Sequence, residues 1–204
     1  MLNPLLNSSS LPSFSKITPE CVAPTIEQLL AQNRETIAAL AHQPTPTWQS
    51  LPAQLEELDD TLSKAWSIVS HLNAVTNSPA WREAYNGCLA KISAYYTELG
   101  QNSDLYNSYQ TLADSNEFAE LNQAQRQAIN NALRDFKLSG VALPTEQKQR
   151  FAAIEERLSA ICAKFADNLL DATQAWHKEL STEELAGIPE ANQGLLAQLA
   201  QQRG

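Results

Sequence analysis

The longest periodic pattern of apolar residues in the chain runs from Pro144 to about Leu180. Its large apolar side chains recur every three or four residues, a spacing that places them all on one face of an α-helix. They are Phe151, Ile154, Leu158, Ile161, Phe165, Leu169, Ala172 and Trp176. At ~1.5 Å per residue this helix would be about 55 Å long, more than one helix of average length can cover. We therefore expect several shorter helices to pack along it.

Five shorter segments with the same helical period precede the long one, and turn residues separate them. Thr18-Pro19-Glu20 is a typical helix start, and the two prolines in the segment 42–47 exclude a continuous helix there. Pro24 predicts a kink or a helix start in two steps. The expected helices are Thr18 to about Ala41, Trp48 to about Thr76, Pro79 to Gly100, Ser103 to about Ala113 and Asn122 to Ser139, with a last piece from Ala191 to Gln202.

These segments predict an all-α protein, a multi-helix bundle of antiparallel helices packed along the long helix at about 144–180. Few runs of β-branched residues interrupt the helical pattern, which agrees with this class. Residues 1–17 are rich in proline and serine and have no period, so we expect an extended arm there. Residues 18–204 form the helical domain. The apolar residues of the arm should lie across the helices, namely Leu2, Leu5, Leu6, Leu11 and Phe14.

Charge and composition exclude several classes of partner. The net charge is −9 at neutral pH, whereas nucleic acids and anionic membranes require a clustered basic surface, so we expect neither as a partner. No apolar run approaches the ~18 residues of a membrane span. The N-terminus has no basic residue before Lys16, unlike a signal peptide. We therefore expect a cytoplasmic protein.

Cysteine usage agrees with a reducing compartment. Cys21, Cys88 and Cys162 show no CxxC spacing, and their number is odd. All three are on or beside apolar helical faces, so we interpret them as small buried hydrophobic residues. The four tryptophans also occupy apolar positions or helix starts, which favours a role in the core over an exposed aromatic surface.

Candidate residues for metal binding are scarce. A helical zinc-peptidase site needs HExxH, in which two imidazoles one turn apart hold the metal and the glutamate activates water. The three histidines, His42, His71 and His177, are in three separate segments and do not form this motif. His71 either faces a cleft or is hydrogen-bonded within the bundle. We assign no metal-binding residue.

Carboxylates are frequent, but their spacing does not predict catalysis. Asp59 and Asp60 are adjacent, as are Glu155 and Glu156. Adjacent residues on a helix do not face each other, so a solvated surface is the better interpretation than a general acid/base pair. No phosphate-binding glycine motif and no GxSxG nucleophile motif occur. We assign no catalytic residue.

Several stretches, taken in order, resemble one protein family. The resemblance is to the thimet-oligopeptidase family of zinc metallopeptidases, and it extends over nearly the whole chain. No single stretch is a catalytic motif, so the specificity lies in the ordered combination. The stretches are FSKITPE at 14–20, SHLNAVTNSP with WREAY at 70–85, NALRDFKLSGVALP at 131–144 with its continuation to residue 173, and LAGIPE at 185–190.

The resemblance implies that the chain is the N-terminal helical domain of a larger zinc metalloendopeptidase. In that family two mostly helical halves flank a narrow channel that admits short peptides, and zinc is bound in the other half. The implied partners are the C-terminal catalytic half of the same polypeptide and short peptide substrates. The implied role is one wall of the substrate channel, but the residues that face the channel are not identified.

The catalytic motif of the family is missing from this chain. HExxH and the downstream glutamate ligand are absent from the sequence, so no catalytic or metal residue is carried over to any position. We therefore expect the chain alone to be inactive and to hold no cofactor, with zinc bound only by the full-length enzyme. Two alternatives remain open. One is a free-standing helical interaction module without catalytic activity, and the other is a bundle that covers an exposed face by forming a dimer.

Overall fold

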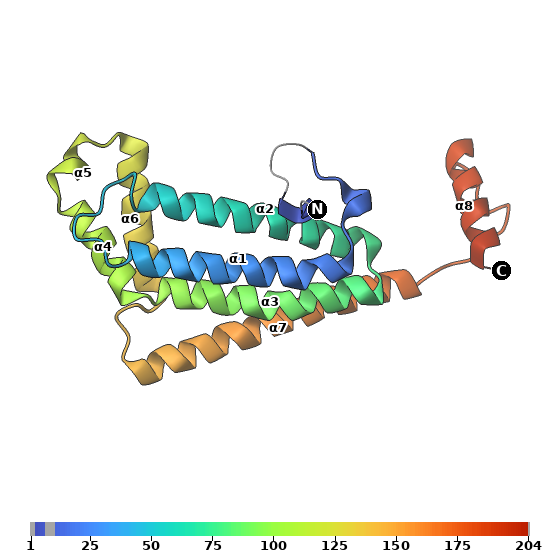
Figure 1. The fold of residues 1–204 in the computed structure, drawn as a ribbon. Helices are drawn as coiled ribbons and strands as arrows, with labels where there is room; N and C mark the ends of the chain where they lie inside the picture. Colours follow the sequence, from blue (N-terminus) through green and yellow to red (C-terminus); the bar gives the residue numbers. More distant parts are fainter. Residues whose placement is uncertain (1–2, 7–10, 204) are drawn as a thin grey trace. The chain divides into compact units, whose positions relative to one another are not determined.

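Helices make up the regular structure in the computed structural model, which describes residues 3–6 and 11–203. The chain forms two compact units, Met1–Ile161 and Cys162–Gly204. Across the described residues no strand occurs, so the predicted all-α class is confirmed. The elements (Figure 1) are η1 (Pro4–Leu6), η2 (Phe14–Lys16), α1 (Pro19–Leu40), α2 (Pro52–Thr76), α3 (Pro79–Gly100), α4 (Ser103–Ala113), α5 (Asn116–Glu120), α6 (Gln123–Leu138), α7 (Thr145–Ala175) and α8 (Glu190–Arg203).

The ends of the helices follow the chemistry of their terminal residues. Proline occupies the first turn of α1, α2 and α3, where its missing N–H leaves no helical hydrogen bond unmade. The Ser78 hydroxyl accepts the N–H of Trp81 at the start of α3. Asn122 and Gln125 form a reciprocal capping box at the start of α6. Asn77 ends α2 with a φ of 45°, a conformation that asparagine tolerates better than most residues.

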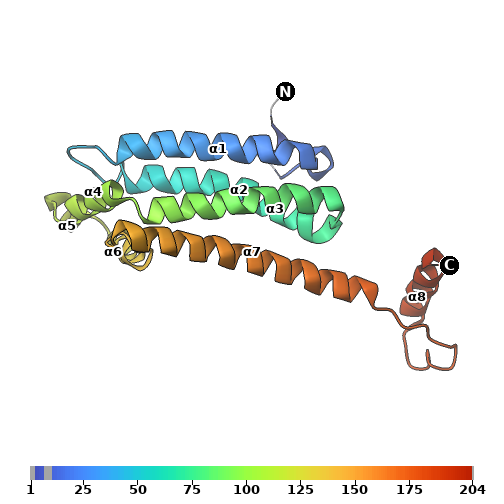
Figure 2. The same cartoon turned by 90° about the horizontal axis from the view of Figure 1, so that it is seen from below.

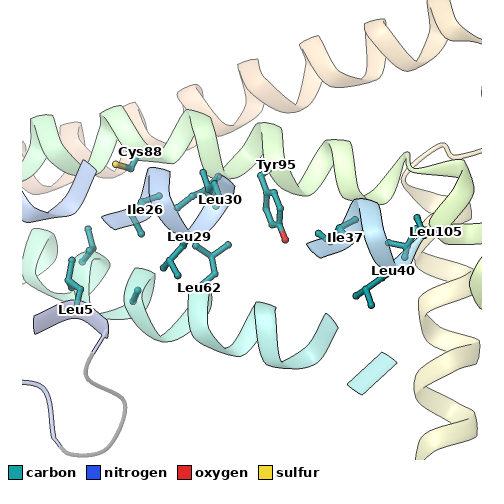
Figure 3. Close-up of a cluster of buried hydrophobic side chains, with 14 of the residues drawn as sticks. Leu5, Ile26, Leu29, Leu30, Ile37, Leu40, Leu62, Cys88, Tyr95 and Leu105 are labelled. Atoms are coloured by element: carbon teal, nitrogen blue, oxygen red, sulfur yellow. The ribbon is translucent and has the colours of Figure 1, made fainter. Parts of the chain in front are cut away.

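The core of the first unit lies between α1, α2 and α3, which pack against one another. These three helices lie side by side in both views (Figures 1 and 2). Helix α1 contributes an almost continuous apolar face to this core, and α4 packs against α6 at one end of the bundle. Figure 3 shows the cluster, which includes Leu5, Ile26, Leu29, Leu30, Leu62 and Cys88. Removing this apolar surface from water is the main stabilising contribution.

Buried polar side chains tie the elements of the first unit together. The Thr25 hydroxyl donates to the Cys21 carbonyl (2.6 Å) and accepts from Asn3 Nδ2 (2.6 Å), which attaches the segment before η1 to α1. Buried Asn33 donates through Nδ2 to the Tyr95 hydroxyl (3.3 Å), joining α1 to α3. The hydroxyl of buried Ser108 donates to the carbonyl oxygen at the end of α1. Each bond satisfies a group that would be costly to bury unpaired.

The long helix differs from the expectation. Helix α7 ends at Ala175 rather than near 180, and none of its residues is buried. Within the first unit, Ile154, Leu158 and Ile161 are between 51% and 54% exposed. In the first unit the shorter helices therefore do not cover the apolar face of α7; α2 and α3 pack against α1 instead, and α4 packs against α6. The start of α7 is anchored by Lys148, whose Nζ donates to the Gln101 carbonyl (3.1 Å) and the Ser103 hydroxyl (3.3 Å).

Other differences from the expected elements are smaller. Helix α2 begins at Pro52, four residues after the expected Trp48, because the residues before the proline form turns. The short helix α5 was missed in the periodicity because five residues are too few to show it. Helix α1 continues through Pro24, which lies in its second turn.

The N-terminal arm contains two short 3-10 helices. Leu5 lies in the core, and η1 contacts α1 and α2. Phe14 contacts the ring of His71, with centroids 5.5 Å apart, whereas Leu11 is exposed. Leu6, also expected to pack on the bundle, is half-buried. Leu2 lies outside the described residues.

Two glycines of α3 predict opposite effects of the same substitution. A Cβ on Gly100 would lie 2.6 Å from the Ser139 Cβ, so α3 and the end of α6 approach too closely for alanine. We expect Gly100→Ala to lower the free energy of unfolding by about 1–3 kcal/mol. Gly87→Ala meets no atom within 4 Å and should raise it by about 0.5–1 kcal/mol, because alanine is the better helix former. Urea unfolding measures both, and a loss at both positions would contradict this packing.

Candidate functional site

A groove of about 740 Å³ opens in the first unit, lined by residues of α2, α3, α4 and α6. Its apolar lining comes from all four helices: Pro52, Leu55, Leu99, Leu105, Ala128, Ala132 and Phe136. Serine and asparagine side chains add hydrogen-bonding groups, namely Ser63, Asn131 and Ser139. A volume of this size is typical of a site for a small molecule or a short peptide.

Four carboxylates line the groove, and no lysine or arginine is among its lining residues. Glu56, Asp59 and Asp60 share one face of α2, because they are three and four residues apart. Asp135 belongs to α6. Asp60 pairs with Lys64 (2.5 Å), which lies one turn further along α2. Asp135 pairs with the neighbouring Arg134 (2.8 Å). Glu56 and Asp59 have no such basic partner in the part of the chain that the structure describes.

Tyr96 and Asp59 form a hydrogen-bonded pair across the groove. The Tyr96 hydroxyl donates to Asp59 Oδ1 over 2.7 Å, which joins α3 to α2. Burial raises the pKa of Tyr96, and the bond to Asp59 and its negative charge raise it further. The phenol therefore stays protonated at neutral pH and keeps donating. The ring of Tyr96 meets that of Tyr95 edge to face, with centroids 5.2 Å apart.

Tyr109 lies deeper in the groove and has an unpartnered hydroxyl. Its side chain is packed against Phe136, with ring centroids 5.6 Å apart, and the residue is only 7% exposed. Within the described ranges no hydrogen bond to its hydroxyl is found, although Tyr109 lines the groove. Burial raises its pKa, and the negative charge of Glu56 adds to the effect. The neutral hydroxyl is therefore available to a bound molecule.

The histidines do not contribute to this groove. His42, His71 and His177 are all exposed, and none of them lines it. His71 contacts Phe14 of the arm. Nearby Asn73 keeps a buried Oδ1 without a hydrogen-bond partner, so it does not pair with His71 through this atom. Among residues 3–6 and 11–203, no three His, Cys, Asp or Glu side chains come together in a way that would hold a metal ion.

Sequence reasoning missed the groove, although parts of its signal were visible. The adjacent Asp59 and Asp60 of α2 were interpreted as a solvated surface, and the tyrosine pair Tyr95 and Tyr96 of α3 was not assigned to a site. Only Tyr95 is buried, whereas Tyr96 is 41% exposed. Nothing in the spacing indicates that α4 and α6 face the same acidic stretch of α2, because these segments are far apart in the sequence.

The cysteines also differ from the expectation. Cys88 is buried as expected, Cys21 is half-buried and Cys162 is exposed, so the prediction of a buried residue is wrong for Cys162. Burial raises the pKa of the Cys88 thiol, and the positive charge of nearby Lys91 offsets only part of this increase. Trp81 is buried and Trp66 stacks on Tyr85 (4.7 Å), in agreement with a packing role, whereas Trp176 is exposed.

Comparison with known proteins identifies the family. Residues 26–148 match the family described as "Neurolysin/Thimet oligopeptidase, N-terminal domain". This match includes all of α2 to α6 and therefore every residue that lines the groove. The chain belongs to the neurolysin/thimet oligopeptidase family. The expected membership in this family is therefore confirmed.

Individual proteins named as oligopeptidases align with the chain over more residues than the family model does. The chain is 47% identical over 205 residues to oligopeptidase A of Haemophilus influenzae, an alignment that covers 100% of this chain and 30% of the relative. It is 47% identical over 193 residues to oligopeptidase A of Escherichia coli, covering 94% of the chain and 28% of the relative. A probable cytosolic oligopeptidase A of Arabidopsis thaliana is 31% identical over 203 residues, with 99% and 29% covered.

The chain thus spans about 30% of the length of the curated relatives that it matches. It corresponds to a peptidase N-terminal domain. None of the helices in the described part of the chain has both the length and the apolar character that a membrane crossing requires.

Burial predicts the order in which the thiols react. Cys162 should react first with an excess of a disulfide reagent at neutral pH, because it is exposed. Cys88 should react only after unfolding, because the thiolate is the nucleophile and a raised pKa reduces its fraction at neutral pH. The absorbance of the coloured thiol that the reagent releases, followed over time with and without urea, measures this order. Cys162→Ser should remove the fast phase, and a fast phase that persists in this variant would contradict the assignment.

Proposed function

We propose that this chain is the N-terminal region of a cytoplasmic zinc metallo-oligopeptidase that hydrolyses short peptides, and that it forms one wall of the substrate channel. The observation that carries the proposal is the alignment: oligopeptidase A of Haemophilus influenzae matches this chain from end to end, yet the chain spans 30% of that relative. A longer polypeptide would supply the catalytic half. The role assigned to this region is to shape and delimit the channel, without taking part in bond cleavage.

The exposed face of α7 supports this proposal. Ile154, Leu158 and Ile161 lie on one face of the helix and are each about half exposed. A row of large apolar side chains of this kind commonly marks an interface, since its burial would contribute about 25 cal/mol per Å² of apolar surface. We assign its cover to the C-terminal half of the same polypeptide. If the chain were instead a free-standing interaction module, a separate partner protein would cover this face.

The described residues do not fit a zinc ion, because no group of three suitable donor side chains comes together. We therefore assign zinc to the other half and derive no catalytic step in this region. The groups that this chain offers to a peptide are those of a binding surface: carboxylates, hydroxyls, amides and apolar side chains.

The gene that encodes the chain tests the proposal directly. The reading frame is expected to stay open after the codon for Gly204 and to encode an HExxH several hundred residues later. The complete product should hydrolyse short peptides and contain zinc, whereas residues 1–204 alone should do neither. A stop codon directly after Gly204 would reject the peptidase assignment and favour an interaction module. Tight stoichiometric zinc binding by residues 1–204 would also contradict the proposal.

A lysine on the apolar face of α7 tests what covers it. Leu158→Lys should change the free energy of unfolding of the 204-residue chain by less than about 0.5 kcal/mol, because Leu158 is 51% exposed. In the complete polypeptide it should cost about 2 kcal/mol or more, since a charge would enter an apolar interface. Urea unfolding of both forms measures the difference.

The matched control places the same residue on the charged face of the same helix. Glu156→Lys should have little effect in either form, because Glu156 is exposed and belongs to the polar side of α7. Equal effects of Leu158→Lys in the two forms would show that the remaining polypeptide does not cover this face. Sedimentation of the 204-residue chain at several concentrations detects a dimer that covers the face instead, because mass action makes association depend on concentration.

A further inference from the structure

We propose that the groove between α2, α3, α4 and α6 is a binding site for a short peptide segment that carries a basic side chain. The ammonium or guanidinium group would lie between Glu56 and Tyr109, and the apolar stem of the side chain would lie on the floor of the groove. The choice of a peptide rests in part on the proposed function, whereas the preference for a cation rests on the groove alone.

The charges of the lining residues determine the sign of the ligand. Four carboxylates line the groove, and two of them already have a basic partner outside it. Glu56 is left without an ion pair in the described residues, and Asp59 receives only the neutral hydroxyl of Tyr96. An anion would be repelled here, and a cation would pair with a carboxylate that has no competing partner.

Tyr109 adds a hydroxyl without a protein partner to the acidic lining of the groove. The residue is only 7% exposed, and its hydroxyl has no hydrogen-bond partner in the described structure. The hydroxyl is not among the fully buried polar atoms that lack a partner, so it is accessible from the groove, where a bound ligand can replace water as its hydrogen-bond partner. Next to Glu56, the hydroxyl can accept a hydrogen bond from an ammonium group or donate one to a peptide carbonyl.

The remaining lining fits a peptide better than a small free amine. Leu55, Leu99 and Phe136 provide an apolar surface for the methylene stem of lysine or arginine and for a neighbouring apolar side chain. Asn131 and Ser139 offer hydrogen bonds at the side formed by α6. A groove of about 740 Å³ is also larger than one basic side chain requires.

Isothermal titration of the 204-residue protein with two peptides tests the proposal. The first is an acetylated and amidated pentapeptide with a central lysine between leucines, and the second replaces lysine by norleucine. The two peptides differ in charge and share the apolar stem. We expect the lysine peptide to bind about tenfold more tightly, and its advantage to shrink as NaCl is raised from about 0.05 to about 0.5 M. Equal binding of the two peptides, or binding of neither, would overturn the proposal.

Two variants locate the binding to the groove. Glu56→Gln should weaken binding of the lysine peptide by about 3- to 10-fold and leave the norleucine peptide unaffected. Tyr109→Phe, which removes only the hydroxyl, should weaken it by a similar factor. Glu57→Gln is the matched control, because Glu57 is the adjacent exposed carboxylate and does not line the groove. Equal losses in Glu56→Gln and Glu57→Gln would overturn the site.

The outcomes separate this site from the proposed function. Selective binding of the lysine peptide stands even if the complete product proves to have no peptidase activity, because titration measures no hydrolysis. Failure of the binding test leaves the gene and activity tests unaffected. Spermidine that binds as tightly as the lysine peptide would overturn the assignment to a peptide, because a free polyamine has no backbone for Asn131 and Ser139. Competition between the two ligands in the same titration measures this directly.

Discussion

The first unit depends on the burial of the apolar face of α1 against α2 and α3. This face includes Val22 and Ile26, which are fully buried, and the leucines one turn further on. Because α1 packs against α2, α3 and η1, much of the remaining packing of the bundle follows from its position. The Asn33–Tyr95 hydrogen bond then fixes how α3 faces α1. A substitution in this face therefore affects the groove as well, although no residue of α1 lines it.

The groove is a product of this arrangement. Helices α2 and α3 are held side by side by the core, and residues of both line one groove together with residues of α4 and α6. Acidic residues that were expected to be uniformly solvated thereby become the lining of a concave surface. The close approach of Gly100 to Ser139 brings the end of α3 next to the end of α6. The site therefore combines residues that are distant in sequence, each placed by local helix geometry and by the shared core.

Much of the helical architecture could be predicted from the sequence, because apolar periodicity and proline or glycine at the ends are local signals. The bounds of α1, α3, α4 and α6 were found within a residue or two. The partner of an apolar face is not a local property, so the stripe of α7 was correctly placed on one face and wrongly expected to be covered within this chain. The same reasoning explains the exposed Cys162. The groove was missed because it depends on how α2, α3, α4 and α6 come together in space, whereas the family was found from several stretches in their order.

The anchoring of α7 by Lys148 has a mechanical consequence for the groove. One ammonium group holds the first turn of α7 to the carbonyl of Gln101 and the hydroxyl of Ser103, at the corner where α3 passes into α4. Gly100, which directly precedes this corner, lines the groove, as does Leu105 shortly after it. A displacement of the first turn of α7 must therefore either break both hydrogen bonds or pull this corner with it. A movement of α7 that keeps both hydrogen bonds would therefore shift Gly100 and Leu105, two residues of the groove lining.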